Sequence, residues 1–157
     1  MTFTRKPMCL FAMLAFASTL FAADPFVGTW KLDPSKSKHS GSAPNAKEAT
    51  IVIEEQGDNY QVTVTGTNSD DSPLSVKYTV PIKGGTGQVE ASGDVFDAVS
   101  SKRIKSNQRE NTYMKGGKNT GTRRSVVSKD GKTLTNTFKG IDAQGNPVTS
   151  IQVFDKQ

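Results

Sequence analysis

The feature that most constrains the fold is a repeated alternation of apolar and polar residues, in short runs that Gly, Asp, Asn and Pro separate. Successive side chains of a β-strand point to opposite faces, so this period of two is typical of a strand with one buried face. The clearest run spans residues 74–82, where five apolar residues alternate with polar ones and with Pro81. After the first 23 residues there is almost no helical periodicity, so we predict an all-β chain.

The turn at 129–132, Lys-Asp-Gly-Lys, carries the strongest local signal, because Asp-Gly suits the positive φ angles of a type I′ hairpin turn. Between the first two runs, residues 33–46 are rich in Pro and Ser, and Asp33 followed by Pro34 predicts a single helical turn there. The runs predicted as strands are 26–32, 48–55, 60–66, 74–82, 88–91, 95–105, 108–115, 119–128, 132–141 and 148–155.

The short turns make neighbouring strands antiparallel. An open meander of this length would leave two exposed edges, which favour aggregation, and no predicted helix covers them. Closure removes the edges, and no long crossover of the kind found in sandwiches is visible. The sequence therefore predicts one domain, an all-β antiparallel up-and-down β-barrel of about ten strands.

The first 23 residues have the three parts of a secretory signal peptide: a basic start at Arg5, an apolar middle and a small-residue end at Ala23. The alternative, a transmembrane anchor, needs about 20 uninterrupted apolar residues, and polar residues interrupt this segment. We expect cleavage before Asp24 and a barrel domain at residues 24–157. We also expect export to the periplasm or the medium of a bacterial cell, with no stable membrane anchor afterwards.

Removal of this segment leaves 134 of the 157 residues and lowers the formal net charge from +5 to +3. It also removes Cys9, the single cysteine, so no disulfide can form in the mature chain. The remaining Lys and Arg residues are scattered along strand patterns rather than gathered in a stripe with aromatic residues. This distribution argues against a nucleic-acid partner.

Residue types that carry catalysis or bind metals are sparse. His39 is the single histidine and lies in a polar connection, where a metal or acid–base role would need partners held in place. Asp70 and Asp71 lie in a polar turn and are expected to be solvated. We therefore expect no catalytic residues, no metal and no cofactor, and a protein that is not an enzyme.

The segment 26–32 reads Phe-Val-Gly-Thr-Trp-Lys-Leu. Its Gly28-x-Trp30 resembles the signature of the calycins, which include the lipocalins and the fatty-acid-binding proteins. The whole mature chain resembles small exported bacterial lipocalin-like proteins of uncharacterised function. The resemblance implies that Gly28 and Trp30 have a structural role in the first strand, with the Trp at the closed end of the barrel.

The sequence departs from the fatty-acid-binding pattern in two places. Residues 33–46 are too short and too rich in Pro and Ser for the helical lid of those proteins. The Arg-x-Tyr of their last strand corresponds here to residues 152–154, Gln-Val-Phe, which lack both the Arg and the Tyr. The resemblance also implies a cation against the Trp, for which Arg123 or Arg124 is available.

The apolar face of the strands is either a packed core or the lining of a cavity, since both have the same composition. We expect a binding protein that holds a lipophilic or amphipathic small molecule inside the barrel. The alternative is an envelope or extracellular module with a solid barrel, which interacts through its surface. An inward Arg124 would need an anionic partner. The residues predicted to line a ligand site are Tyr60, Tyr78, Phe96, Tyr113, Arg124 and Phe138.

Overall fold

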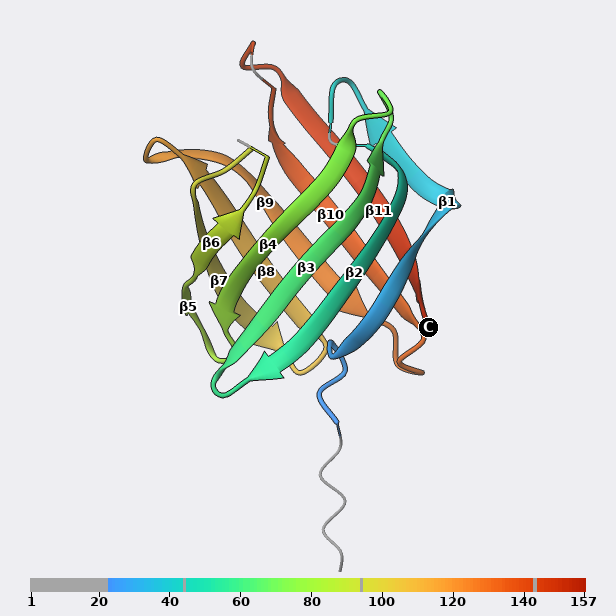
Figure 1. Ribbon diagram of the computed structural model, residues 1–157, viewed down its shortest axis with the longest axis vertical. Helices are drawn as coiled ribbons and strands as arrows, with labels where there is room; N and C mark the ends of the chain where they lie inside the picture. Colours follow the sequence, from blue (N-terminus) through green and yellow to red (C-terminus); the bar gives the residue numbers. More distant parts are fainter. Residues whose placement is uncertain (1–22, 44, 94, 143) are drawn as a thin grey trace, which may run out of the picture.

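Antiparallel strands dominate the computed structural model, which describes residues 23–43, 45–93, 95–142 and 144–157 (Figure 1). Those residues form eleven strands and no helix. The strands are β1 (Gly28–Ser40), β2 (Ala46–Gln56), β3 (Asn59–Asn68), β4 (Pro73–Pro81), β5 (Gly84–Thr86), β6 (Gln88–Ala91), β7 (Ala98–Lys105), β8 (Gln108–Lys115), β9 (Lys118–Val127), β10 (Thr133–Ile141) and β11 (Pro147–Lys156).

The predicted all-β antiparallel barrel is confirmed. Consecutive strands pair from β1 to β4 and from β7 to β11, and β11 pairs back onto β1. The additional strand is β5, a stretch of Gly84–Thr86 that the sequence predicts as a turn and that pairs instead with β7. The predicted signal peptide lies outside the described residues, apart from Ala23. No helix in the described part of the chain is long and apolar enough to cross a membrane.

The barrel is nearly closed, with a seam between the edge strands β5 and β6. β6 pairs with β4 and β5 pairs with β7, so the chain crosses the seam at Gly87, between the two edges. The Gly87 N–H donates to the Val99 carbonyl oxygen at 2.8 Å. A Cβ at this position would lie 2.1 Å from the Thr79 carbonyl oxygen. Only a residue without a side chain lets the two edges approach this closely.

The first strand is longer than predicted, and the predicted helical turn at Asp33 is wrong. β1 runs to Ser40 and bends at a bulge between Asp33 and Lys38, visible at the right of Figure 1 near its label. The Asp33 carboxylate accepts hydrogen bonds from the Ser35 N–H at 2.9 Å and the Ser35 hydroxyl at 2.6 Å. The Ser37 hydroxyl accepts from the Val153 N–H at 3.0 Å. Side chains thus take over the pairing that the bulge interrupts.

Trp30 is fully buried and lies opposite Lys156, the last residue of β11. The start of β1 and the end of β11 lie at the same end of the barrel (Figure 1). Its Nε1–H donates to the Phe26 carbonyl oxygen at 2.9 Å. The cation over its ring is Lys156, whose Nζ lies 5.0 Å from the ring centroid, rather than Arg123 or Arg124. Gly28 has φ +135°, and a Cβ there would lie 2.8 Å from the Lys156 Cε, so this glycine makes room for the lysine stem.

Replacing the seam glycine tests how the barrel closes. Gly87→Val should lower the free energy of unfolding by about 3 kcal/mol, because the new side chain must push β4 away from β7. Chemical denaturation measures the loss, and amide hydrogen exchange should show faster exchange in β6. The control is Thr86→Ala at the exposed neighbouring position, for which a change below about 0.5 kcal/mol is expected. A Gly87→Val protein as stable as the wild type would contradict this closure.

Candidate ligand site inside the barrel

The interior has two walls of different chemistry. The apolar wall comes from β2, β3 and β4, whose cross-strand pairs bring Ile51 opposite Val64 and Ile53 opposite Val62. On the other side of β3, Val62 lies opposite Tyr78. These side chains are buried and belong to one hydrophobic cluster, so this wall offers no side-chain counter-charge to an ionic group.

The facing wall, from β8 to β11, carries a band of polar side chains two rows deep. Seven of the eight positions in these rows are polar, the exception being Phe138, and we call these seven the polar band. The pairing register aligns Asn111, Arg123, Phe138 and Ser150 in the upper row, and Arg109, Ser125, Asn136 and Gln152 in the lower row. Below the band, Val127, Leu134 and Phe154 form a fully apolar row, so the polarity is confined to the middle of the barrel.

Arg123 is the central residue of the polar band. Its Cζ lies 5.2 Å from the centroid of the Tyr113 ring, and its Nε is buried without a hydrogen-bond partner. Within the described part of the chain no carboxylate pairs with it. Burial raises the pKa of the nearby Tyr78 hydroxyl well above its usual value, so Tyr78 is neutral and supplies no negative charge to Arg123. Arginine stays protonated in proteins, and the interior therefore holds an uncompensated positive charge.

Other buried polar atoms of this wall also lack partners. The Asn111 and Asn136 Oδ1 atoms and the Tyr113 hydroxyl make no hydrogen bond in the described structure. The Asn111 Nδ2 donates to the Tyr78 hydroxyl at 3.3 Å, so one half of this amide is satisfied. Unpaired buried polar groups each cost about 1–3 kcal/mol, and a cluster of them marks a place where another molecule or water completes the bonds.

A cavity of about 40 Å³ lies between the two walls. Its lining includes the polar-band residues Arg109, Asn111, Arg123, Ser125 and Asn136 and no acidic residue. One water needs roughly 10–15 Å³ by this measure, so the space holds a few waters or a carboxylate group. It does not hold a whole lipid.

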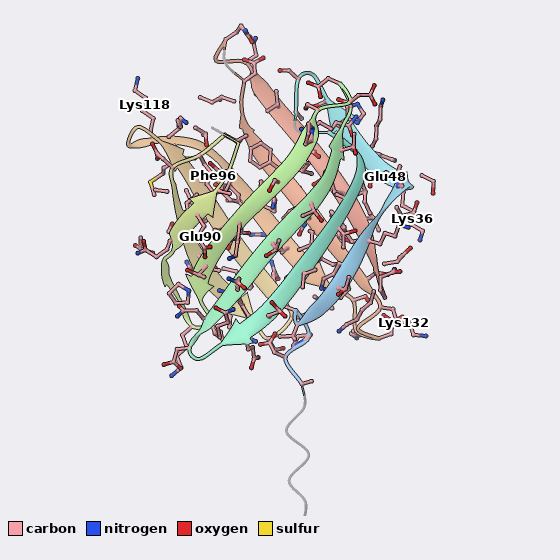
Figure 2. All side chains as sticks on the ribbon, viewed as in Figure 1. Lys36, Glu48, Glu90, Phe96, Lys118 and Lys132 are labelled. Atoms are coloured by element: carbon pink, nitrogen blue, oxygen red, sulfur yellow. The ribbon has the colours of Figure 1, made fainter. Side chains whose placement is uncertain are left out.

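Aromatic rings fill the space beside Arg123. The Phe96 and Tyr113 ring centroids are 4.8 Å apart, and Tyr78 meets Phe96 edge-on at 6.0 Å. Phe138 lies 6.5 Å from Tyr113 and covers the backbone of the Gly121–Gly140 pair. Figure 2 shows Phe96 near the end of the barrel opposite the start of β1, whereas the labelled Lys118 and Lys132 point outward.

A second cluster closes the base. Arg103 donates to the Asp24 carboxylate from Nη1 and Nη2, both at 3.0 Å, and to the Tyr60 hydroxyl at 3.2 Å. Burial opposes ionisation of Asp24, but Tyr60, the Phe26 N–H and Arg103 together hold its pKa below 3.8. Burial, with Asp24 nearby, raises the pKa of Tyr60 to about 12.

Arg109, the other arginine of the polar band, already has its partners. It donates to the carbonyl oxygens of Ile82 at 2.6 Å and Pro81 at 2.8 Å, and to the Ser101 hydroxyl at 2.7 Å. Its Cζ also lies 4.8 Å from the centroid of the Tyr60 ring. Arg109 thus ties the end of β4 to β7 and β8. Among the described residues, Arg123 contacts the Tyr113 ring but has no carboxylate partner, and its Nε makes no hydrogen bond.

The structure corrects one predicted site residue. Arg124 lies on the outer face, where its Nη2 is 3.5 Å from the Glu110 carboxylate, and its side chain is 56% exposed. The inward arginine is Arg123. The other predicted residues are brought together as aromatic contacts: Tyr78, Phe96, Tyr113 and Phe138 in one cluster, and Tyr60 at the base.

The prediction missed the amides of the polar band. Asn136 shares a face with Leu134 and Phe138, so the alternation in β10 already directs it inward. Asn111 has the same relation to Tyr113 in β8. A search for polar residues in phase with buried apolar ones would have found both. No group of acidic, His or Cys side chains able to hold a metal is present in the described residues.

Comparison with known proteins supports the fold. No protein-family model matches the chain, and no curated protein matches its sequence. Among solved structures, the zebrafish ileal bile acid-binding protein, crystallised with cholic acid, is similar with a TM-score of 0.52 and 14% sequence identity. The match covers 85% of this chain and 99% of that one. The chain therefore shares the β-barrel fold of that structure.

Removing the inward charge should stabilise the empty protein. Arg123→Met replaces an inward, half-buried cation whose Nε is unpaired with an apolar side chain, so the free energy of unfolding should rise by about 1–2 kcal/mol. Thermal and urea denaturation measure it. Arg124→Met is the matched control on the outer face, with an expected change below about 0.5 kcal/mol. A large loss of stability for Arg123→Met would show that Arg123 is a structural residue instead.

The base cluster predicts a pH-dependent contribution from Asp24. Because its folded pKa is below the unfolded 3.8, Asp24 adds stability that is complete above about pH 5, declines as the pH falls below 3.8 and is lost as the pH falls through the lower, folded pKa. Urea denaturation of wild type and Asp24→Asn should therefore differ at pH 7, and the difference should shrink below pH 4. Asp58→Asn, in the exposed β2–β3 turn, is the control and should change little. A difference that does not vary with pH would contradict this contribution.

Proposed function

We propose that this protein is an exported, non-enzymatic binding protein that holds an amphipathic anionic small molecule inside its barrel. The anionic group would lie against Arg123, and the apolar part would lie along the wall from β2 to β4. The observation that carries the proposal is the guanidinium of Arg123, which faces the interior with a buried Nε and no counter-charge.

The positive charge of Arg123 is not required to pack a solid barrel core. An apolar residue at position 123 would fill a core at lower cost than a half-buried guanidinium whose Nε is buried without a hydrogen-bond partner. A carboxylate or sulfonate ligand supplies the missing charge and can accept two hydrogen bonds from one guanidinium. The site thus combines a large apolar surface with a few convergent polar groups, as small-molecule sites do.

The ligand of the similar barrel is consistent with this chemistry. The zebrafish protein was crystallised with cholic acid, a carboxylic acid on an apolar frame. Export is supported by the basic start, apolar middle and small-residue end of residues 1–23.

Ligand entry would require the interior to open. The cavity of about 40 Å³ fits the anionic group, so the apolar part must displace aromatic side chains. Phe96 is the best placed to move, because it precedes β7 and is not itself in a strand. We expect binding to be slow and coupled to repacking of the rings of Tyr78, Phe96, Tyr113 and Phe138.

The small cavity also favours a second candidate, a solid-barrel module that interacts through its surface. In that case waters would occupy the cavity and complete the bonds of Arg123 and the two amides. The two candidates differ in whether an anionic amphiphile enters the interior.

Binding of decanoate and of the uncharged 1-decanol separates them. Wild-type protein should bind decanoate at least about tenfold more tightly than decanol, which corresponds to about 1.4 kcal/mol. Displacement of a fluorescent naphthalenesulfonate dye or isothermal titration measures both. Arg123→Gln should abolish the preference for the anion, and Arg124→Gln should keep it. If neither compound binds, or if the preference survives in Arg123→Gln, the proposal is wrong.

A further inference from the structure

The unpaired groups of the polar band are of two chemical kinds. Arg123 only donates hydrogen bonds, whereas the free atoms of Asn111 and Asn136 are carbonyl oxygens that accept them. The Tyr113 hydroxyl, also unpaired, does both. Asn136 is 4% exposed and Asn111 9% exposed, so bulk water does not reach these amides freely.

An anion alone satisfies only half of this set. An ionised carboxylate has no hydrogen to donate, so it pairs with Arg123 and leaves both amide oxygens unmet, at a cost of about 1–3 kcal/mol each. A hydroxyl group donates and accepts, and it therefore suits a carboxamide whichever way its oxygen and nitrogen are oriented. The complementary ligand carries a hydroxyl as well as an anionic group.

The register of the strands limits the separation of these two groups. Arg123 on β9 lies directly opposite Asn111 on β8, and Asn136 on β10 lies one row lower, opposite Ser125. Directly opposite Cβ atoms are about 5 Å apart and diagonal ones about 7–8 Å. Asn111, Asn136 and Arg123 also line the same cavity of about 40 Å³. The hydroxyl must then lie within a few bonds of the anionic carbon.

From this arrangement, and resting on the proposed function, we infer that the ligand is a hydroxy acid: a carboxylate with a hydroxyl on the second or third carbon and an apolar tail. The carboxylate pairs with Arg123, and the hydroxyl bonds to the amide of Asn136 or Asn111. The tail contacts the apolar wall of Ile51, Ile53 and Val64, which also lines the cavity.

The competing occupant of the amide sites is water. A few waters fit the cavity and would satisfy the amides as well as a ligand hydroxyl does. If waters fill these positions while a plain carboxylate is bound, the hydroxyl adds no affinity. The affinities of a hydroxy acid and of its parent acid therefore show whether a ligand hydroxyl or water occupies the amide sites.

The probes are 3-hydroxydecanoate, as separate enantiomers, and decanoate, measured by isothermal titration. For wild-type protein one enantiomer should bind about tenfold more tightly than decanoate. Asn136→Leu or Asn111→Leu, each of which is close in volume and removes an unmet amide, should bring the two acids to equal affinity without weakening decanoate. Thr137→Val, at the neighbouring outward position of β10, should leave the preference intact. Arg123→Gln should weaken both acids.

The failures of the two proposals can be told apart. Equal affinity of the acids for wild-type protein, with decanoate binding still lost in Arg123→Gln, overturns the hydroxy-acid inference and leaves the anion site standing. A preference that persists in both Asn136→Leu and Asn111→Leu also overturns it. No binding of either acid overturns the proposed function and the inference together.

Discussion

The position of Arg123 depends on the backbone ladder that surrounds it. β9 pairs on one side with β8 and on the other with β10, so the direction of each side chain on β9 is set by hydrogen bonds along both edges. Turning Arg123 outward would require a shift of one residue, which would turn Val127 and Gly121 outward as well. The strand pairing and packing of the barrel therefore keep the Arg123 side chain inside, although its charge lowers the stability of the fold.

The two ends of the barrel differ in the side-chain interactions that stabilise them. At the base, Lys156 of β11 lies over the Trp30 ring and Arg103 of β7 pairs with Asp24, so two other strands hold the N-terminal segment. At the other end, aromatic rings fill the space without a comparable hydrogen-bond network, and the Tyr113 hydroxyl is unpaired. A ligand would therefore meet less resistance from the aromatic end. The polar band lies between these two regions, within reach of an anionic group whose tail lies along the apolar wall from β2 to β4.

The strands could be predicted from alternation because one face of each is buried, and the closure of the barrel followed from the short turns. The site was harder to predict. Arg123 and Arg124 are adjacent, and so are Val126 and Val127, so the alternation in β9 has no clear phase and either arginine could face inward. Only pairing with Glu110 and Asn111 on β8 resolves it. Gly84–Thr86 has no apolar face at all. This segment is a strand because its backbone pairs with β7, a contact that the sequence pattern does not reveal.

The central claim is that Arg123 binds the anionic group of an organic ligand. A crystal structure of the protein, purified from its own source without added lipid, tests this claim most directly. The account predicts continuous density for an organic molecule between the two walls, with an oxygen within hydrogen-bond distance of the Arg123 guanidinium. Density for separate water molecules alone around Arg123, Asn111 and Asn136, with the aromatic rings in place, would contradict it.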